Sequence, residues 1–269
     1  MNNEFKISVI IPTILKNTKV LLKLIHLLSN DEAVSEILII ENSGKGLFLP
    51  PNKKIKIYNS KENLYVNPSW NLGISKIEND RFLIINDDIL PVENFCTIIL
   101  RTNILEQNNT GLVGIDTAYI CQNNRGTTLD IEIPDATEKN ISINRMDKIL
   151  RTGDWGSAYF GKKESYYEIP DDLKIIYGDN YLLKMNQAFG KTNYKISGIP
   201  FNHIHSLSSA SSEFSKIIGN DIKNSKKYFS WFLNLSIHNA TYITIYLKQM
   251  LKHIAEKSKN WHKFIMKFF

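Results

Sequence analysis

The chain has 269 residues and a formal net charge of +6, and 43% of its residues are hydrophobic. This composition is typical of a globular protein and excludes a disordered or a collagen-like chain. Two cysteines, Cys96 and Cys121, are too few for a disulfide framework or a cysteine-rich zinc site, which favours a reducing compartment. The first residues lack the basic and long apolar regions of a secretion signal, so we expect a cytoplasmic protein.

Apolar runs that are typical of buried strands alternate with helix-like patterns through the first 91 residues. Alternation of this kind with short connections predicts an α/β fold, in which helices flank a mostly parallel sheet. The predicted strands are 6–12, 37–40, 54–58 and 81–85, and the predicted helices between them are 18–28 and 68–76.

The second half of the chain is less regular. Apolar spacing predicts helices from about 92 to 107, over 177–189 and from about 211 to the end, with a strand at 112–115 and an extended segment at 194–205. Residues 116–150 are polar and irregular, and 153–161 are rich in glycine and aromatic residues.

Polar residues follow three of the predicted strands directly, and ligands bind at the carboxyl ends of strands in parallel sheets. Asp87 and Asp88 are the most informative, because adjacent carboxylates cannot both lie in a core. Two carboxylates at such a position suit Mg²⁺ or Mn²⁺, which would bridge to phosphate oxygens. The alternative is a turn at the end of the strand, since Asn and Asp favour turns.

Four motifs in this order and spacing resemble those of GT-A glycosyltransferases, particularly the family 2 type. The motifs are ISVIIPT (7–13), LIIENS (38–43), ENLYVNPSWNLGI (62–74) and RFLIINDDILP (81–91). The resemblance covers Ile7 to about Pro91 well, is patchier to His205 and ends there. It implies a GT-A fold and transfer of a sugar from a nucleotide donor with inversion of configuration.

The resemblance also implies roles for individual residues on the donor side. Asn86-Asp87-Asp88 matches the family's Asp-x-Asp motif, with Asn86 in place of the first Asp; Asp88 would be the metal ligand and Mn²⁺ or Mg²⁺ the cofactor. Glu41 stands where many relatives have Asp. The residues expected to bind the nucleotide-sugar are Pro12, Thr13, Glu41, Asn63, Asn71, Asn86 and Asp87.

The same resemblance implies a catalytic base and a second metal ligand further along the chain. Family members carry an acidic pair at a helix start, and here only Asp179 remains of it, because Gly178 replaces the other acid. The alternative is that Asp179 only caps the helix, and Asp154 is then the reserve candidate. His205 fits a ligand for the metal or the diphosphate better than His203 does. Trp155, together with Asp154, is expected on the acceptor side.

The end of the chain is basic, because residues 216–269 hold ten lysines and two acids, a net charge of +8. Apolar residues recur there every seventh position from Leu233 to Phe268, which predicts an amphipathic helix or helical pair. The segment would pack on the catalytic domain, pair with another subunit or lie on an anionic membrane surface. No apolar stretch long enough to span a membrane is expected.

The sequence therefore predicts a catalytic domain at 1–210, with a nucleotide-sugar half at 1–91 and an acceptor half at 92–210, and a helical tail at 211–269. The expected activity is transfer of a hexose, from a UDP-linked donor, to a glycan or lipid-linked acceptor in bacterial surface polysaccharide synthesis. The enzyme would be cytoplasmic or peripheral on the inner membrane face, and no nucleic-acid partner is expected. A sugar nucleotidyltransferase and a non-catalytic, degenerate scaffold are the alternatives.

Overall fold

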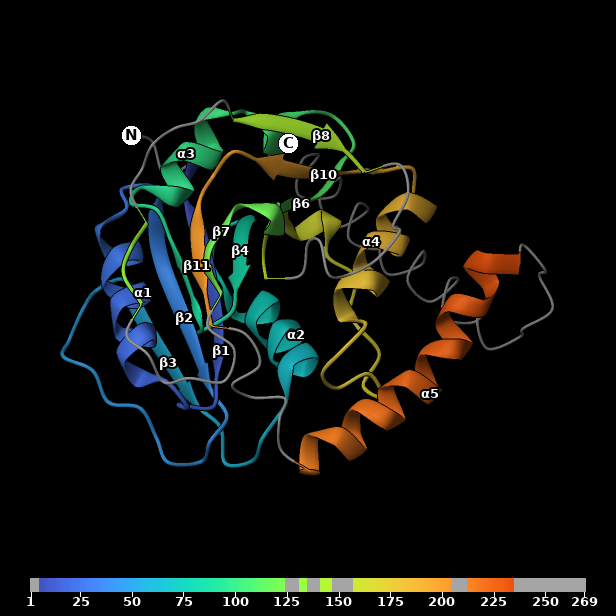
Figure 1. Ribbon diagram of the computed structural model, residues 1–269, viewed down its shortest axis with the longest axis horizontal. Helices are drawn as coiled ribbons and strands as arrows, with labels where there is room; N and C mark the ends of the chain where they lie inside the picture. Colours follow the sequence, from blue (N-terminus) through green and yellow to red (C-terminus); the bar gives the residue numbers. More distant parts are fainter. Residues whose placement is uncertain (1–4, 124–130, 135–140, 147–156, 205–211, 235–269) are drawn as a thin grey trace, which may run out of the picture. The chain divides into compact units, whose positions relative to one another are not determined.

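The structure is a computed structural model of an α/β protein, and it describes residues 5–123, 131–134, 141–146, 157–204 and 212–234. An eight-stranded, mostly parallel sheet lies at its centre (Figure 1), which confirms the predicted fold class. The strands, in their order across the sheet, are β3 (Ile55–Asn59), β2 (Val34–Glu41), β1 (Ile7–Thr13), β4 (Arg81–Ile85), β9 (Ala158–Lys162), β6 (Thr110–Ile115), β10 (Thr192–Ser197) and β8 (Ser142–Arg145).

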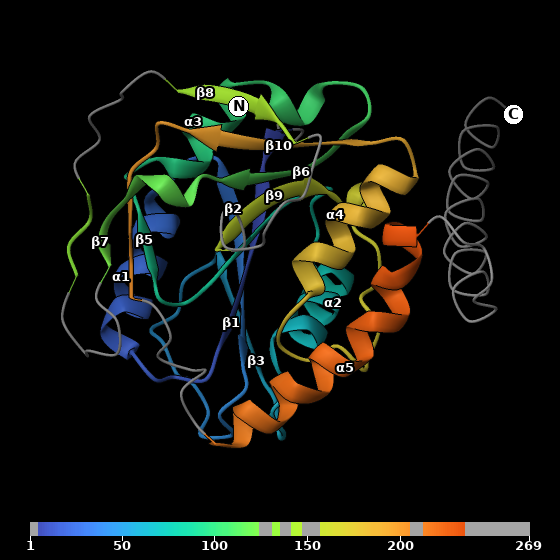
Figure 2. The same cartoon turned by 45° about the vertical axis from the view of Figure 1, so that its right-hand side comes forward.

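Helices cover both faces of this sheet: α1 and α3 lie on one side, and α2 and α4 on the other (Figures 1 and 2). Strand β1 shows why both faces need cover, because its successive apolar side chains point to opposite faces of the sheet. Val9 and Ile11 belong to the core on the α1 side. Ile10 faces α2, and a Cβ on Gly73 would come within 2.5 Å of it, so this glycine permits the close approach. The helices are α1 (Thr18–Asn30), α2 (Val66–Lys76), α3 (Phe95–Arg101), α4 (Gly178–Ala188) and α5 (Ser212–Asn234).

The strands from β3 to β4 run parallel to one another, so their carboxyl ends share one edge of the sheet. Strand β9 runs antiparallel to both β4 and β6, and β10 runs parallel to β6. The carboxyl ends of β6 and β10 therefore lie at the same edge as those of β1, β2 and β4. This is the edge at which the polar residues of the sequence motifs accumulate.

A second, three-stranded sheet lies close to this edge. Its strands are β5 (Ile89–Pro91), β11 (Phe201–His203) and β7 (Ile120–Asn123), with β11 in the centre. Strand β5 begins directly after Asp88, and the antiparallel ladder places His203 opposite Ile89. Chain segments more than a hundred residues apart thus meet next to the Asp87–Asp88 pair.

The structure differs from the expected elements in the second half. The helix expected over 92–107 ends at Arg101, because Asn103 adopts a left-handed conformation with φ of 55° and a 3-10 turn follows (η2, Ile104–Glu106). The region 116–150 contains a 3-10 turn, η3 (Thr117–Tyr119), and the strands β7 and β8. The glycine-rich stretch contains β9, and the 3-10 turn η5 (Lys163–Ser165) follows it.

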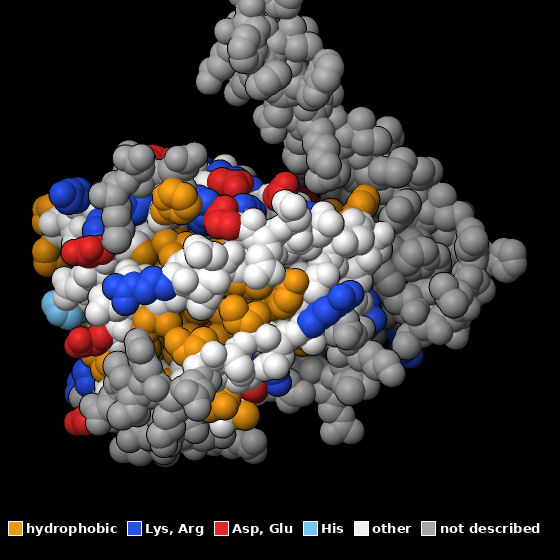
Figure 3. All heavy atoms as spheres, turned by 90° about the horizontal axis from the view of Figure 1, so that it is seen from above, with side chains coloured by type: hydrophobic (Ala, Val, Ile, Leu, Met, Phe, Trp, Pro, Cys, Tyr) orange, Lys and Arg blue, Asp and Glu red, His pale blue; other side chains and the backbone are white. Residues whose placement is uncertain are grey.

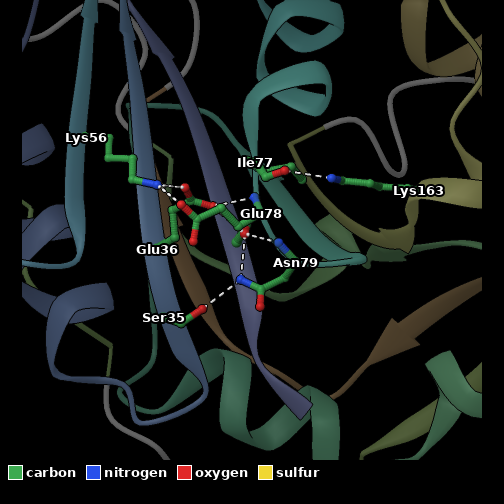
Figure 4. A network of polar contacts seen from close by, with 8 residues as sticks. Ser35, Glu36, Lys56, Ile77, Glu78, Asn79 and Lys163 are labelled. Carbon is green, nitrogen blue, oxygen red and sulfur yellow. Dashed lines mark hydrogen bonds and ion pairs between the residues drawn. The ribbon is translucent and has the colours of Figure 1, made fainter. Parts of the chain in front are cut away.

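At the opposite edge, where the parallel strands begin, a polar network ties the connection between α2 and β4 to the sheet (Figure 4). Glu36 of β2 is its centre, and its carboxylate accepts hydrogen bonds from Lys56 at 2.6 Å and Ser8 at 2.7 Å. The backbone N–H of Glu78 donates to the same carboxylate at 3.0 Å. Asn79 donates to Ser8 at 2.8 Å, so Glu78 and Asn79 join the connection to β2 and β1, while Lys56 and Ser8 join β3 and β1 to β2.

The chain divides into two compact units, residues 1–221 and 222–269, and the dividing point lies within α5.

On the face shown in Figure 3, hydrophobic side chains gather in the middle and most charged side chains lie around them. Partly buried apolar side chains, Leu100, Ile143 and Tyr194 among them, pack against the core. None of the helices in the described ranges has the length and apolar character that spanning a bilayer requires.

Candidate functional site

Three strands of the parallel half end in polar side chains that the structure brings together. Thr13 ends β1 and Glu41 ends β2, and the two are partners in the ladder between those strands. Asp87 lies two residues beyond the end of β4, and the Thr13 hydroxyl donates a 2.5 Å hydrogen bond to its carboxylate. The Thr13 hydroxyl and the Asp87 carboxyl group thus lie side by side at the carboxyl ends of β1 and β4.

Asp87 is a half-buried carboxyl group with little to stabilise its charge. Burial raises the pKa of Asp87 to about 7, and the neighbouring Asp88 carboxylate adds to the rise. The hydrogen bond from Thr13 opposes the shift but does not cancel it. A cation next to the pair would favour the charged form of both groups, so the site is electrostatically suited to one.

Asp88 lies against His203, a contact that the small sheet creates. The backbone N–H of Ile204 donates to the Asp88 carbonyl at 3.0 Å, and His203 Nε2 lies 3.3 Å from Asp88 Oδ1. That carboxylate oxygen is buried and accepts no hydrogen bond within the described part of the chain. The sequence ranks His203 below His205, but His203 is the histidine that the described residues place at this carboxylate; His205 itself lies outside them.

The donor set suits a hard divalent cation that is shared with a substrate. Mg²⁺ is usually held by one or two carboxylates together with substrate phosphates, and it keeps several waters. The buried Asp88 oxygen without a hydrogen bond is the observation that fits such an ion. Within the ranges that the structure describes, no group of three or more His, Cys, Asp and Glu side chains is arranged to hold a metal by itself.

Asp179 lies in the first turn of α4, and the topology directs it to the same edge of the sheet. α4 ends shortly before β10 begins, so its C-terminal end is at the edge where the parallel strands start. Its first turn therefore points toward their carboxyl ends. In agreement, Asp179 interacts electrostatically with Tyr159 of β9, which pairs with Ile84 of β4.

Asp179 is not the N-cap of α4, because that position is Tyr177. The Asp179 carboxylate accepts the N–H of its neighbour Asn180 at 2.9 Å, and its own backbone N–H also lowers its pKa. Burial raises the pKa of Asp179 to about 6. A carboxyl group with a pKa near neutrality is suited to accept and release a proton at physiological pH.

Three other expected nucleotide-binding residues make hydrogen bonds within the protein. The buried Glu41 carboxylate accepts the backbone N–H groups of Ser43 and of Gly46, which orders the loop after β2. Asn63 accepts the N–H of Tyr65 at 2.8 Å, a local turn. The side-chain N–H of Asn71 donates to the carbonyl of Ile169 at 2.8 Å, and its side-chain oxygen accepts the hydroxyl of Tyr166.

Pro12 and Asn86 flank the central strands at this edge. Pro12 is buried in β1, and the recorded ladder between β1 and β4 ends at Ile10, so its missing N–H interrupts no bond to β4. The N–H of Asn86 donates to the carbonyl of Ser157 at 3.2 Å, and its side chain is half-buried. Asp154 and Trp155, expected on the acceptor side, lie outside the described residues.

Two buried polar residues bind the segment that leads to Asp179, and the sequence motifs assign no role to either of them. Asn67 of α2 and Asp221 of α5 have no exposed surface, and both bind the backbone of the segment 173–176 that leads to α4. A buried Asn in a helix and an Asp in a basic tail are unusual positions for polar side chains. That burial appears only in the folded chain, so the sequence alone offers no signal for their partners.

Comparison with known proteins identifies no family for this chain. No protein family model matches it, and no curated protein matches it either. Among solved structures, 331 chains match, so the architecture is widespread and does not select a function. One is the crystal structure of S. aureus TarS (residues 1–349), a glycosyltransferase, with 12% identity and a TM-score of 0.47 over 94% of this chain and 82% of that one. A likeness of this size carries no argument about function.

Proposed function

We propose that the protein is an inverting glycosyltransferase that moves a hexose from a UDP-linked sugar to a glycan or lipid-linked acceptor. One observation carries the proposal: the Asp87–Asp88 pair, in which burial and Asp88 raise the pKa of Asp87 to about 7, and a separate carboxyl group with a pKa of about 6 both lie at the carboxyl edge of a parallel sheet. Ligands bind at this edge in open α/β sheets. The motif pattern of the sequence gives the reaction class.

On the donor side, this chain's residues would bind and orient the nucleotide-sugar. Asp88 and His203 would hold Mn²⁺ or Mg²⁺, which, when bound, supplies charge neutralisation to the leaving diphosphate. Thr13 fixes the Asp87 carboxyl through its hydrogen bond, so that Asp87 faces the ribose or sugar in one orientation. Glu41 orders the loop after β2, and this loop would border the donor.

On the acceptor side, Asp179 would take the proton from the attacking hydroxyl. Inversion needs one base on the face of the sugar opposite the leaving group, and one carboxylate suffices. With a pKa of about 6, the group is mostly ionised at pH 7 and still binds a proton well. Its partial burial thus brings the pKa of the proton acceptor close to the pH at which it would work.

Nucleotide binding tests the donor side without knowledge of the acceptor. We expect UDP and UDP-sugars with Mn²⁺ to raise the melting temperature of the wild-type protein and to be slowly hydrolysed. Asp88→Ala removes the ligand of the cation and should abolish this stabilisation. Asp171→Ala, the change of an exposed aspartate, is the matched control and should retain it.

The outcomes separate the alternatives. Stabilisation by nucleotide-sugars without hydrolysis or transfer would favour a non-catalytic binding protein. Stabilisation by nucleoside triphosphates alone, with release of pyrophosphate from a sugar phosphate, would favour a nucleotidyltransferase. If no nucleotide stabilises the protein with or without Mn²⁺, the proposed donor site is wrong.

A further inference from the structure

A buried acidic side chain of α5 binds the chain segment that precedes α4. Asp221 has no exposed surface, and its carboxylate accepts the N–H groups of three consecutive residues. The distances are 2.9 Å from Lys174, 2.7 Å from Ile175 and 3.0 Å from Ile176. Hydrogen bonds to an ionised acceptor are the stronger kind, and three adjacent ones fix three successive peptide planes.

Asn67 of α2 binds the same segment from its carbonyl side. Its side-chain amide donates to the carbonyls of Leu173 at 3.1 Å and Ile176 at 3.2 Å, and its own N–H donates to Lys174 at 2.9 Å. Asn67, like Asp221, has no exposed surface. The segment 173–176 is therefore held through its N–H groups by one helix and through its carbonyl groups by another.

The held segment continues directly into the first turn of α4. Tyr177 adopts a left-handed conformation with φ of 67°, which a non-glycine residue keeps only when its surroundings impose it. A Cβ on Gly178 would lie 2.1 Å from Asn67 Oδ1, so α2 and α4 touch at this point. Asp179 comes next, three residues after the last N–H that Asp221 binds. A shift of the segment therefore shifts Asp179.

We propose that Asp221 is a positioning residue for Asp179, and that the first turns of α5 thereby form part of the reaction centre. The catalytic part of this inference rests on the proposed function, in which Asp179 is the base. Phe214 supports it, because its ring packs edge-on against Tyr65, the N-cap of α2, at 6.2 Å. The same stretch of α5 thus contacts the start of α2 and the approach to α4.

The test compares Asp221→Asn with a matched change at Asp31. Asp31 is also buried, and its carboxylate also accepts backbone N–H groups of a distant segment, those of Cys96 at 2.7 Å and Thr97 at 3.2 Å. These bonds lie at the start of α3, on the other side of the sheet from α4 (Figure 1). Asp31→Asn therefore reports the cost of losing such a carboxylate without affecting Asp179.

We expect Asp221→Asn to lower kcat by about 10- to 100-fold with little change in the KM for the donor, since misplacement of a reacting group by about 1 Å costs roughly that much. Asp31→Asn should lower the melting temperature and leave kcat unchanged. Asp221→Glu, which keeps the charge but lengthens the side chain, should lower kcat to an intermediate degree. Wild-type kcat in both Asp221 variants would overturn the proposal.

Titration of Asp179, followed by NMR of the labelled carboxyl carbons, gives a readout that needs no activity. In the wild type its pKa is expected at about 6. In Asp221→Asn, or in Asp221→Glu if the Asn variant does not fold, it should fall toward the ordinary value of 3.8 as the first turn of α4 loosens, whereas Asp31→Asn should leave it in place. An unchanged titration in the Asp221 variants overturns the inference. If the wild type transfers no sugar, the proposed function fails, and the titration still decides whether Asp221 positions Asp179.

Discussion

The two edges of the parallel sheet treat a buried carboxylate in opposite ways. At the edge where the strands begin, burial acts to raise the pKa of Glu36, but the hydrogen bonds from Lys56, Glu78 and Ser8 outweigh it, and the pKa is lowered. At the edge where the strands end, burial and Asp88 raise the pKa of Asp87 to about 7. The groups that lower the pKa of Asp87 are the Thr13 hydroxyl and a backbone N–H, and no cation is among the causes of the shift.

The difference distinguishes an acid that stabilises the fold from one that we propose serves a ligand. The charge of Glu36 is stabilised by hydrogen bonds from within the chain, and the group ties the connection between α2 and β4 to the sheet. The charge of Asp87 is left for a ligand to compensate. Perturbed carboxyl groups of this second kind gather at functional sites. Four changes would break or sharpen this contrast.

The largest effect is expected at Asp179, a carboxyl group whose pKa burial raises to about 6. Asp179→Asn keeps the shape of the side chain but removes the proton acceptor, so we expect transfer to slow by about 10²- to 10⁴-fold. The affinity for the donor should change little. Steady-state kinetics and donor titration by calorimetry measure both quantities, and an unchanged rate would return Asp179 to a structural role.

A loss of stability without loss of function is expected at Glu36. Glu36→Gln leaves the backbone N–H of Glu78 without a charged acceptor and leaves Lys56 with the Glu78 carboxylate alone. The loss should cost about 1–3 kcal/mol of unfolding free energy. The share of Lys56 is small, because its side chain is 47% exposed. Urea unfolding measures the change. Weakened nucleotide binding in this variant would contradict the separation between the two edges.

A pH-dependent effect is expected at Asp87. Its folded-state pKa of about 7 exceeds the ordinary 3.8, so the folded chain binds this proton more tightly than the unfolded chain does. The resulting stability is complete below about pH 4 and is lost as the pH rises through 7. In EDTA, urea midpoints should therefore fall between pH 5 and 8, and Asp87→Asn should flatten that fall. Equal slopes in both proteins would place the titrating group elsewhere.

The smallest effect on catalysis is expected at the end of the chain. Deletion of residues 248–269, which lie outside the described residues, should leave transfer to a soluble acceptor largely intact. The lysines of this segment would gain roughly 1 kcal/mol each near an anionic leaflet. Sedimentation with anionic liposomes and light scattering should then show loss of membrane binding or of an oligomer. Precipitation of the shortened protein would mean that the segment belongs to the core.

The parallel half of the fold was predictable because its strands are buried on both faces. Such strands appear in the sequence as continuous apolar runs, and 81–85 matches β4 residue for residue. Strand β9 was not predictable, because four of its five residues lie in the glycine-rich, aromatic stretch and it pairs with β4 and β6, which are distant in sequence. Pairing over such separations leaves no local pattern.

The candidate site shows the same division. Thr13 and Asp87 could be expected to meet, because the ends of neighbouring parallel strands share an edge. His203 meets Asp88 only because β11 pairs with β5, which periodicity does not reveal. Asn71 matches the motif, yet its amide bonds to the loop before α4. The sequence predicts contacts between the ends of neighbouring parallel strands. It does not predict contacts that require two segments distant in sequence to pair.

The attachment of Asp221 to the segment 173–176 has a practical consequence for the design of shortened proteins. The catalytic domain predicted from the sequence ends at residue 210, and that is where a crystallographer would cut to remove the basic tail. Such a truncation would remove the acceptor of three neighbouring N–H groups, each of which costs about 1–3 kcal/mol if it is left buried without a partner. A truncation that preserves the fold of the first unit must continue through α5 to at least residue 221.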